Sequence, residues 1–140
     1  MKIKYASIFI IGTLLSLYAC TKGANNGPAT IVGKWNIVSD STYADVGYLN
    51  HPVDYAGQPG DYFNITANGV IYTKEGAQLD TLSYHLMADT GIVITSFGVI
   101  ANGVPQVSRI KTLTSTSLVI ASPLFLSPGG IFGRKITLSR

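Results

Sequence analysis

Hydrophobic and polar residues alternate along most of the chain after residue 30, with the period of two that is typical of half-buried β-strands. Within residues 31–39, Gly33, Trp35 and Ile37 fall on one face. Trp35 is the only tryptophan, and its large apolar side chain is expected to close one end of a core. Gly33 leaves room for another segment to approach closely. The pattern predicts a first strand over residues 31–39.

The clearest local pattern is a hairpin over residues 61–75. Phe63 and Ile65 alternate with polar residues, and Asn68 and Gly69 follow at the point where the chain must turn. Asparagine and glycine both tolerate the positive φ angles of tight hairpin turns. The sequence therefore predicts two antiparallel strands joined at Asn68 and Gly69.

Five further short strands are predicted between segments rich in Gly, Asn, Asp and Pro, and no amphipathic helical pattern is present. Together with the first strand and the hairpin they make eight strands, which favours an antiparallel barrel or sandwich. Closure into a barrel removes exposed sheet edges. Long loops are expected at residues 40–60 and 98–104. The five strands are expected at residues 79–87, 92–97, 106–113, 117–125 and 131–139.

The first twenty residues are typical of a bacterial export signal. Lys2 and Lys4 precede an apolar stretch, residues 6–17, that is too short to span a bilayer. The stretch ends in Leu-Tyr-Ala-Cys, with Cys20 as the only cysteine of the chain. This ending resembles a lipobox, which implies that Cys20 carries lipid. The alternative is an ordinary signal peptide with an incidental cysteine. Residues 21–30 lack periodicity and are expected to form a flexible tether.

The charge of the chain argues against nucleic-acid binding. Ten basic and seven acidic residues give a formal net charge of +3. Removal of Lys2 and Lys4 with the export signal reduces the net charge to +1. The only adjacent basic pair is Arg134 and Lys135, and no basic cluster is present.

Gly-x-Trp at the opening of the first strand resembles the lipocalin superfamily. The chain from Cys20 onward is similar to small lipocalin-like lipoproteins of Bacteroidota. The resemblance implies an all-β, eight-stranded, up-and-down antiparallel barrel over residues 31–140. It also implies an anchor in the outer membrane, with the domain facing the periplasm. Typical lipocalins carry a helix after the last strand, whereas this sequence ends at Arg140, so no C-terminal helix is expected.

In the lipocalin pattern a basic residue late in the last strand packs across the tryptophan. Arg134 and Arg140 are the two candidates, and parity places both on one face of the last strand. In an antiparallel pairing, the end of the last strand lies beside Gly33 and Trp35. We therefore expect Arg140 to stack on Trp35.

Residues with the potential for chemistry are few. The histidines, His51 and His85, lack a third ligand or a partner motif, so neither a metal, a cofactor nor a catalytic site is predicted. Tyr43, Tyr48 and Tyr55 belong to the expected loop over the open barrel end. They are interpreted either as a ligand mouth or as side chains that pack the loop onto the rim.

Two three-residue segments match a Bacteroidota O-glycosylation pattern, Asp followed by Ser or Thr and then a small or apolar residue. The hydroxyl residues of these segments are Ser41 and Thr81.

Two functional hypotheses follow. The first is an outer-membrane-anchored binding protein that holds a small apolar or amphipathic molecule in its barrel. The second is a filled barrel that serves as a structural, interaction or inhibitor-like module of the envelope. A continuous apolar cavity above Trp35 favours the first. An interior filled by aromatic side chains favours the second; the candidates are Phe63, Tyr84, Phe97 and Phe125.

Overall fold

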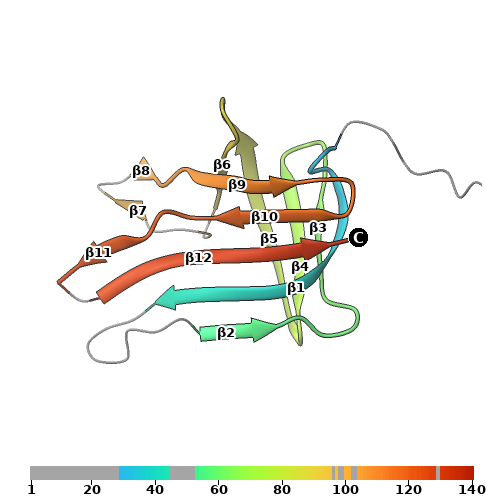
Figure 1. Ribbon diagram of the computed structural model, residues 1–140, viewed down its shortest axis with the longest axis horizontal. Helices are drawn as coiled ribbons and strands as arrows, with labels where there is room; N and C mark the ends of the chain where they lie inside the picture. Colours follow the sequence, from blue (N-terminus) through green and yellow to red (C-terminus); the bar gives the residue numbers. More distant parts are fainter. Residues whose placement is uncertain (1–28, 45–52, 96, 98–99, 102–103, 129) are drawn as a thin grey trace, which may run out of the picture.

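A computed structural model describes residues 29–44, 53–95, 97, 100–101, 104–128 and 130–140. These residues form twelve β-strands and no helix (Figure 1). The strands are β1 (Gly33–Ala44), β2 (Val53–Ala56), β3 (Tyr62–Ile65), β4 (Val70–Glu75), β5 (Gln78–Leu86), β6 (Gly91–Ile94), β7 (Ile100–Ala101), β8 (Val104–Pro105), β9 (Ser108–Leu113), β10 (Ser117–Ala121), β11 (Phe125–Ser127) and β12 (Gly130–Ser139).

Eight of the strands close into an up-and-down antiparallel barrel, which confirms the fold predicted from the sequence. The ring runs β1, β3, β4, β5, β6, β9, β10 and β12, and β12 pairs back with β1. In Figure 1, β9, β10, β12 and β1 lie side by side, while β3, β4 and β5 cross steeply behind them. β7 and β8 form a separate small hairpin.

A membrane-crossing helix is also absent from the described part of the chain: no helix there has the required length and apolar character.

The prediction of a loop over residues 40–60 is wrong at residues 40–44 and 53–56, whereas residues 57–60 are loop as predicted. β1 continues to Ala44, and β2 occupies Val53–Ala56. Residues 39–42 pair with β12 on one side and with β2 on the other. Because two neighbouring strands satisfy its backbone hydrogen bonds, this polar segment is extended despite its weak hydrophobic pattern.

Three predicted strands are shorter than expected, and the one predicted at 106–113 begins only at Ser108, as β9. The strand predicted at 117–125 divides into β10 and β11 because Pro123 has no N–H to give to the sheet. The strand predicted at 92–97 ends at Ile94, where the N–H of Phe97 donates to the Ile94 carbonyl in a turn, 3.3 Å. The loop predicted at 98–104 contains strand β7 and the start of β8.

The hairpin predicted at 61–75 is confirmed as β3 and β4. Gly69 has a φ angle of +82°, as the turn requires. The Thr66 hydroxyl accepts from the Val70 N–H and donates to the Val70 carbonyl, which closes the turn.

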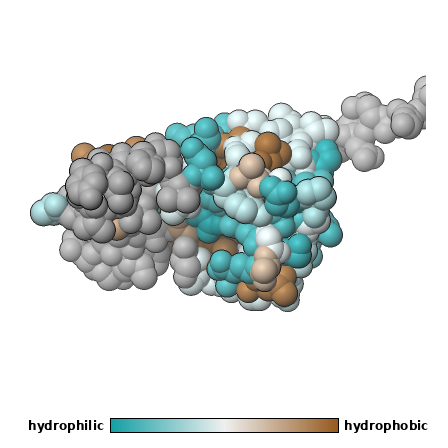
Figure 2. All heavy atoms as spheres, turned by 90° about the horizontal axis from the view of Figure 1, so that it is seen from below, coloured by the Kyte–Doolittle hydropathy of each residue, from teal (hydrophilic) through white to brown (hydrophobic). Residues whose placement is uncertain are grey.

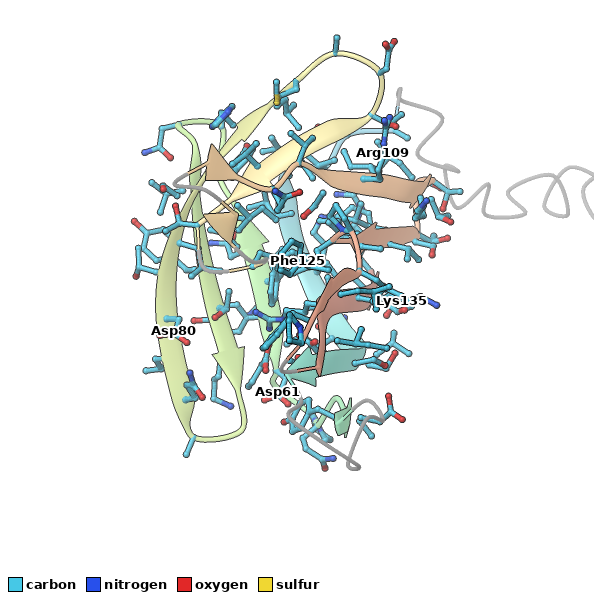
Figure 3. The ribbon with its side chains drawn as sticks, turned by 90° about the vertical axis from the view of Figure 1, so that its left-hand side faces the viewer. Asp61, Asp80, Arg109, Phe125 and Lys135 are labelled. Carbon is cyan, nitrogen blue, oxygen red and sulfur yellow. The ribbon has the colours of Figure 1, made fainter. Side chains whose placement is uncertain are left out.

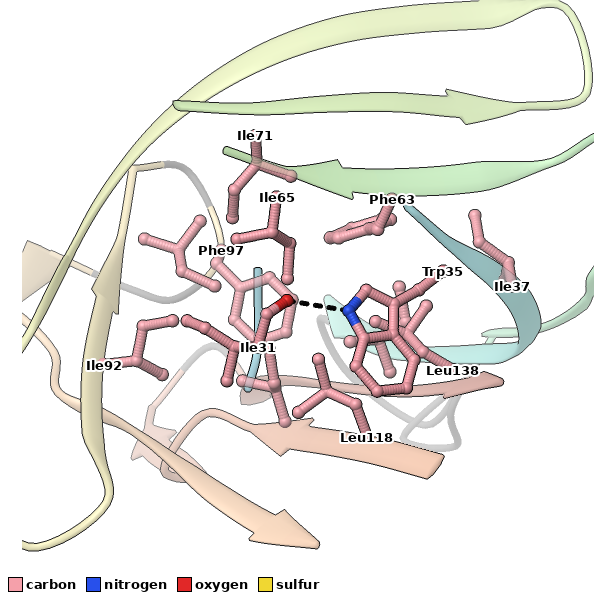
Figure 4. Packing of buried hydrophobic residues seen from close by; sticks show 13 residues of the cluster. Ile31, Trp35, Ile37, Phe63, Ile65, Ile71, Ile92, Phe97, Leu118 and Leu138 are labelled. Carbon is pink, nitrogen blue, oxygen red and sulfur yellow. Dashed lines mark hydrogen bonds between the residues drawn. The ribbon is translucent and has the colours of Figure 1, made fainter. Parts of the chain in front are cut away.

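A core of apolar side chains fills the barrel around Trp35, which has 0% exposure (Figure 4). The Trp35 indole N–H donates to the Ile31 carbonyl at 2.7 Å, so its polar atom is satisfied inside the core. The remaining members of this cluster are Ile31, Ile37, Phe63, Ile65, Ile71, Ile92, Ile94, Phe97, Leu118, Ile120, Ile136 and Leu138.

Candidate functional site

The barrel end at Trp35, here called the closed end, is covered by Arg140. The Arg140 guanidinium lies 4.0 Å from the centre of the Trp35 ring. Its nitrogens donate to the carbonyls of Ser115, Val32 and Thr30 at 2.9, 3.3 and 3.2 Å. The contact expected between Arg140 and Trp35 is therefore present, and it ties the last strand to the entry of the first.

Gly33 provides the space that this contact needs. A Cβ atom built on Gly33 would lie 3.0 Å from Nη1 of Arg140, and the residue has a φ angle of +131°. An L-amino acid with a side chain is strained at such an angle. The close approach expected at Gly33 is thus made by the Arg140 guanidinium.

The opposite end of the barrel, here called the mouth, contains a second arginine. Arg134 lies on β12, six residues before Arg140 in the sequence. Its Nε and Nη2 donate to the Asp40 carboxylate at 2.8 and 2.5 Å, and Nη2 also reaches Glu75 Oε1 at 2.7 Å. The Arg134 guanidinium lies 5.0 Å from the Phe97 ring centre and 6.0 Å from that of Phe63. These groups form a layer of charge directly over the aromatic side of the core.

Burial and neighbouring charges shift the pKa values of Arg134 and Glu75. The side chains of Asp40, Arg134 and Glu75 are 3%, 19% and 24% exposed. Burial lowers the pKa of Arg134, but the hydrogen bond and charge of Asp40 outweigh this effect and raise it. Burial raises the pKa of Glu75; Arg134 lowers that pKa and Asp40 raises it further. Burial, with a smaller effect of Asp40, therefore keeps the pKa of Glu75 above its usual value despite the Arg134 guanidinium.

A cavity of about 350 Å³ opens above the charged layer. The register of β4 and β5 explains its polar walls, because Thr73 faces Asp80 and Glu75 faces Gln78 across the two strands. Figure 3 views the barrel from the side of β11, with Asp80 on β5 and Asp61 at the lower edge. The cavity is lined by Thr73, Glu75, Gln78, Asp80, Thr81, Leu82 and Arg134.

From below, the described surface is hydrophilic across its middle and has hydrophobic patches toward its borders (Figure 2).

Asp61 holds the rim of the mouth together. Its buried carboxylate accepts hydrogen bonds from the Tyr55 hydroxyl and from the N–H groups of Gln58 and Gly76, at 2.8 and 2.9 Å for the two N–H groups. Lys74 adds an ion pair at 3.5 Å. The Tyr55 hydrogen bond, followed by the one from Gln58, lowers the pKa of Asp61 to about 2. The same bond raises the pKa of Tyr55.

The three tyrosines proposed for the ligand mouth are described to different extents. Tyr55 is half-buried against the core, with its hydroxyl on Asp61, so it supports the rim. Tyr43 is described only as backbone in β1, and Tyr48 lies outside the described residues.

Of the other candidate residues that the structure describes, Thr81 belongs to the wall of the cavity. The Ser41 hydroxyl donates to Asp54 at 2.5 Å. His85 is exposed on β5. Cys20 and His51 lie outside the described residues.

Sequence reasoning missed the pairing of Arg134 with Asp40. A bulge between Ile37 and Ser39 reverses the alternation of β1, so Ile37 and Asp40, three residues apart, both point inward. The feature of the sequence that could have indicated this ion pair is Arg134. It shares the inward parity of Ile136 and Leu138, and a buried arginine requires an acidic partner.

Among the described residues, no group of three or more His, Cys, Asp or Glu side chains has an arrangement that could hold a metal ion. Comparison of the chain with protein-family models, with curated proteins and with solved structures finds no match.

Proposed function

We propose that this protein is a lipid-anchored, lipocalin-like binding protein of the cell envelope that holds a small amphipathic molecule at the mouth of its barrel. The observation that carries this proposal is the 350 Å³ cavity, which has charged walls and lies over a filled apolar core. A concave site with a few convergent polar groups is the usual form of a small-molecule site.

The division of the interior argues for a ligand with a polar group. A wholly apolar molecule would have to separate Arg134 from Asp40 to reach the core, which would leave a buried charge without a partner. A ligand with a polar group avoids this cost because that group can bind the cavity walls. Its apolar part can rest on Leu82, which also lines the cavity.

The anchor and the location form part of the proposal. Lipid on Cys20 would anchor the domain durably, since two or three acyl chains are enough for stable membrane binding. The proposed location is the outer membrane, with the domain on the periplasmic side. Changing Cys20 to alanine is expected to leave the protein uncleaved or soluble in cell fractionation. A processed Cys20→Ala protein that remains with the membranes would contradict lipidation.

We infer binding rather than catalysis. Arg134, Asp40 and Glu75 are held by one another. The cavity lining includes neither histidine nor cysteine. The site thus offers hydrogen bonds and charge, without an activated nucleophile.

A filled barrel that acts as a structural, interaction or inhibitor-like module is the second candidate. The observation in its favour is the close packing around Trp35, where Phe63 and Leu138 also have 0% exposure. In this case a protein, rather than a small molecule, would accompany the chain.

Native mass spectrometry of the full-length protein, extracted in detergent from its own membranes, tests the proposal. We expect a one-to-one complex with a small molecule that is lost in Gln78→Trp, where a large side chain replaces one in the cavity wall. The control is Thr112→Trp on the exposed side of β9, which should retain the molecule. Absence of a small molecule from the wild-type protein, together with capture of a protein partner, would favour the second candidate.

A further inference from the structure

Charge is unevenly balanced around the mouth cavity. Arg134 is the positive group in its lining, and the carboxylates of Glu75 and Asp80 lie in the same lining. Asp40 adds a third carboxylate on the guanidinium. Lys74 is paired with Asp61 at the rim, so that pair adds no net charge. Among the described residues, the lining thus has two carboxylates and one guanidinium, and the buried Asp40 carboxylate beneath Arg134 already pairs with that guanidinium.

The two carboxylates in the lining stand on adjacent strands. Glu75 is directly opposite Gln78, and Asp80 is two residues further along β5. Diagonal neighbours of this kind on one face of an antiparallel pair are about 7–8 Å apart at the backbone. A group that donates several hydrogen bonds can reach both side chains across such a gap. An ammonium group has three donors and a positive charge.

The charges and contacts of the lining favour an organic cation over a metal ion or a small anion as the ligand. The Asp80 carboxylate accepts a hydrogen bond from Gln78 Nε2 at 2.7 Å, and no Lys or Arg of the described residues forms a salt bridge with it. The described carboxylates do not form a group of three that could hold a metal ion. A small anion would be repelled by the excess negative charge.

We infer that the mouth cavity binds its ligand through a cationic group, a primary ammonium that lies between the carboxylates of Glu75 and Asp80. The inference rests on the proposed function and specifies the chemical class of the ligand. Arg134 fixes Glu75 from the other side, and Leu82 provides an apolar contact for the rest of the molecule.

Three probes of one size and different charge test this inference: 2-phenylethylamine, 2-phenylethanol and phenylacetate. Binding to the full-length protein in detergent is measured by ligand-observed NMR. We expect the amine to bind in the millimolar range or tighter, with an affinity about tenfold or more above that of phenylacetate, and the alcohol between them. Rising salt should reduce this difference.

Two isosteric variants locate the effect. Asp80→Asn should remove most of the preference for the amine. Asp89→Asn makes the same change of charge in the turn between β5 and β6, and asparagine tolerates the positive φ of 55° found there. This control should keep the preference. A uniform loss in both variants would assign the effect to net charge and would overturn the inference.

Other outcomes separate this inference from the proposed function. Equal or tighter binding of phenylacetate, or failure of the amine to bind, would overturn the cationic inference. A co-purified molecule that is anionic and is lost in Gln78→Trp would do so as well, while the proposed function would stand. If the wild-type protein carries no co-purified molecule and binds none of the three probes, both the proposed function and the cationic inference are rejected.

Discussion

The two ends of the barrel use the same kind of residue in different ways. Arg140 at the closed end stacks on Trp35 and donates to three backbone carbonyls. Arg134 at the mouth binds the carboxylates of Asp40 and Glu75. At the closed end the acceptors are neutral backbone carbonyls, so the contacts of Arg140 bring no carboxylate into the barrel. Carboxylates at the mouth leave a buried layer with excess negative charge, next to a cavity.

This difference separates the part of the fold that apolar burial stabilises from the part that contains the cavity. Burial of apolar side chains around Trp35 contributes favourably in proportion to the area removed from water. Buried ion pairs contribute little net stability, because desolvation offsets their attraction. We therefore interpret the closed end as the part that holds the barrel together, and the mouth as the part that the proposed function uses for binding.

The largest loss of stability is expected for Trp35→Ala. Deleting a fully buried large aromatic side chain costs about 3–5 kcal/mol, which is a large fraction of the stability of a typical domain. Urea titration measures the free energy of unfolding. Trp35→Phe, which keeps an aromatic ring, should lose less. A cost for Trp35→Ala below about 1 kcal/mol would contradict the role given to the closed end.

A somewhat smaller loss is expected for Arg134→Met. Removing one partner of a buried ion pair costs about 3–5 kcal/mol, because Asp40 remains buried without a counter-charge. The lower end of this range is expected here, since the Arg134 side chain is 19% exposed. Adding Asp40→Asn to this variant should recover part of the loss. If the double variant is as unstable as the sum of the two single variants, the pair is not coupled in the way described.

The rim can be tested by pH. Because the pKa of Asp61 is about 2 in the folded protein, its contribution to stability is complete above its ordinary pKa of 3.8. That contribution is lost as the pH falls from about 4 toward 2. Asp61→Asn should be less stable at neutral pH and should show a flatter stability profile in this range. Because the pKa of Glu75 is raised, the effect of Glu75 on stability runs in the opposite direction: its contribution falls as the pH rises above its ordinary pKa of 4.5. Equal slopes for wild type and Asp61→Asn would contradict the assignment.

The smallest effect is expected for Arg140→Ala. The guanidinium is exposed, and a contact of this kind contributes about 0.5–2 kcal/mol. The loss should be visible as a small shift in the urea midpoint, with Arg140→Lys between wild type and alanine. A loss as large as that of Arg134→Met would mean that the two ends do not differ as proposed.

The parts of the fold that were predictable depend on local patterns. The hairpin at Asn68 and Gly69 follows from turn chemistry. Trp35 and Arg140 follow from parity, strand direction and the lipocalin resemblance. These features need only the residues themselves and an antiparallel sheet.

The features that were not predictable depend on interruptions of the sheet. The bulge between Ile37 and Ser39 turns Asp40 inward, where parity alone places it outward. Pro123 divides a predicted strand into β10 and β11. The partners of Arg134 lie 94 and 59 residues away along the chain, so they could be assigned only once the barrel register was known.

The most direct test of the difference between the two ends uses the single tryptophan. The full-length protein, labelled with ¹⁵N in detergent micelles, is titrated with 2-phenylethylamine, and its amide and indole resonances are followed. We predict that β4 and β5 signals from Thr73, Glu75 and Asp80 move on binding. The Trp35 indole N–H, bonded to the Ile31 carbonyl, should stay unchanged. A saturable shift of the Trp35 indole, with β4 and β5 unaffected, would contradict the account.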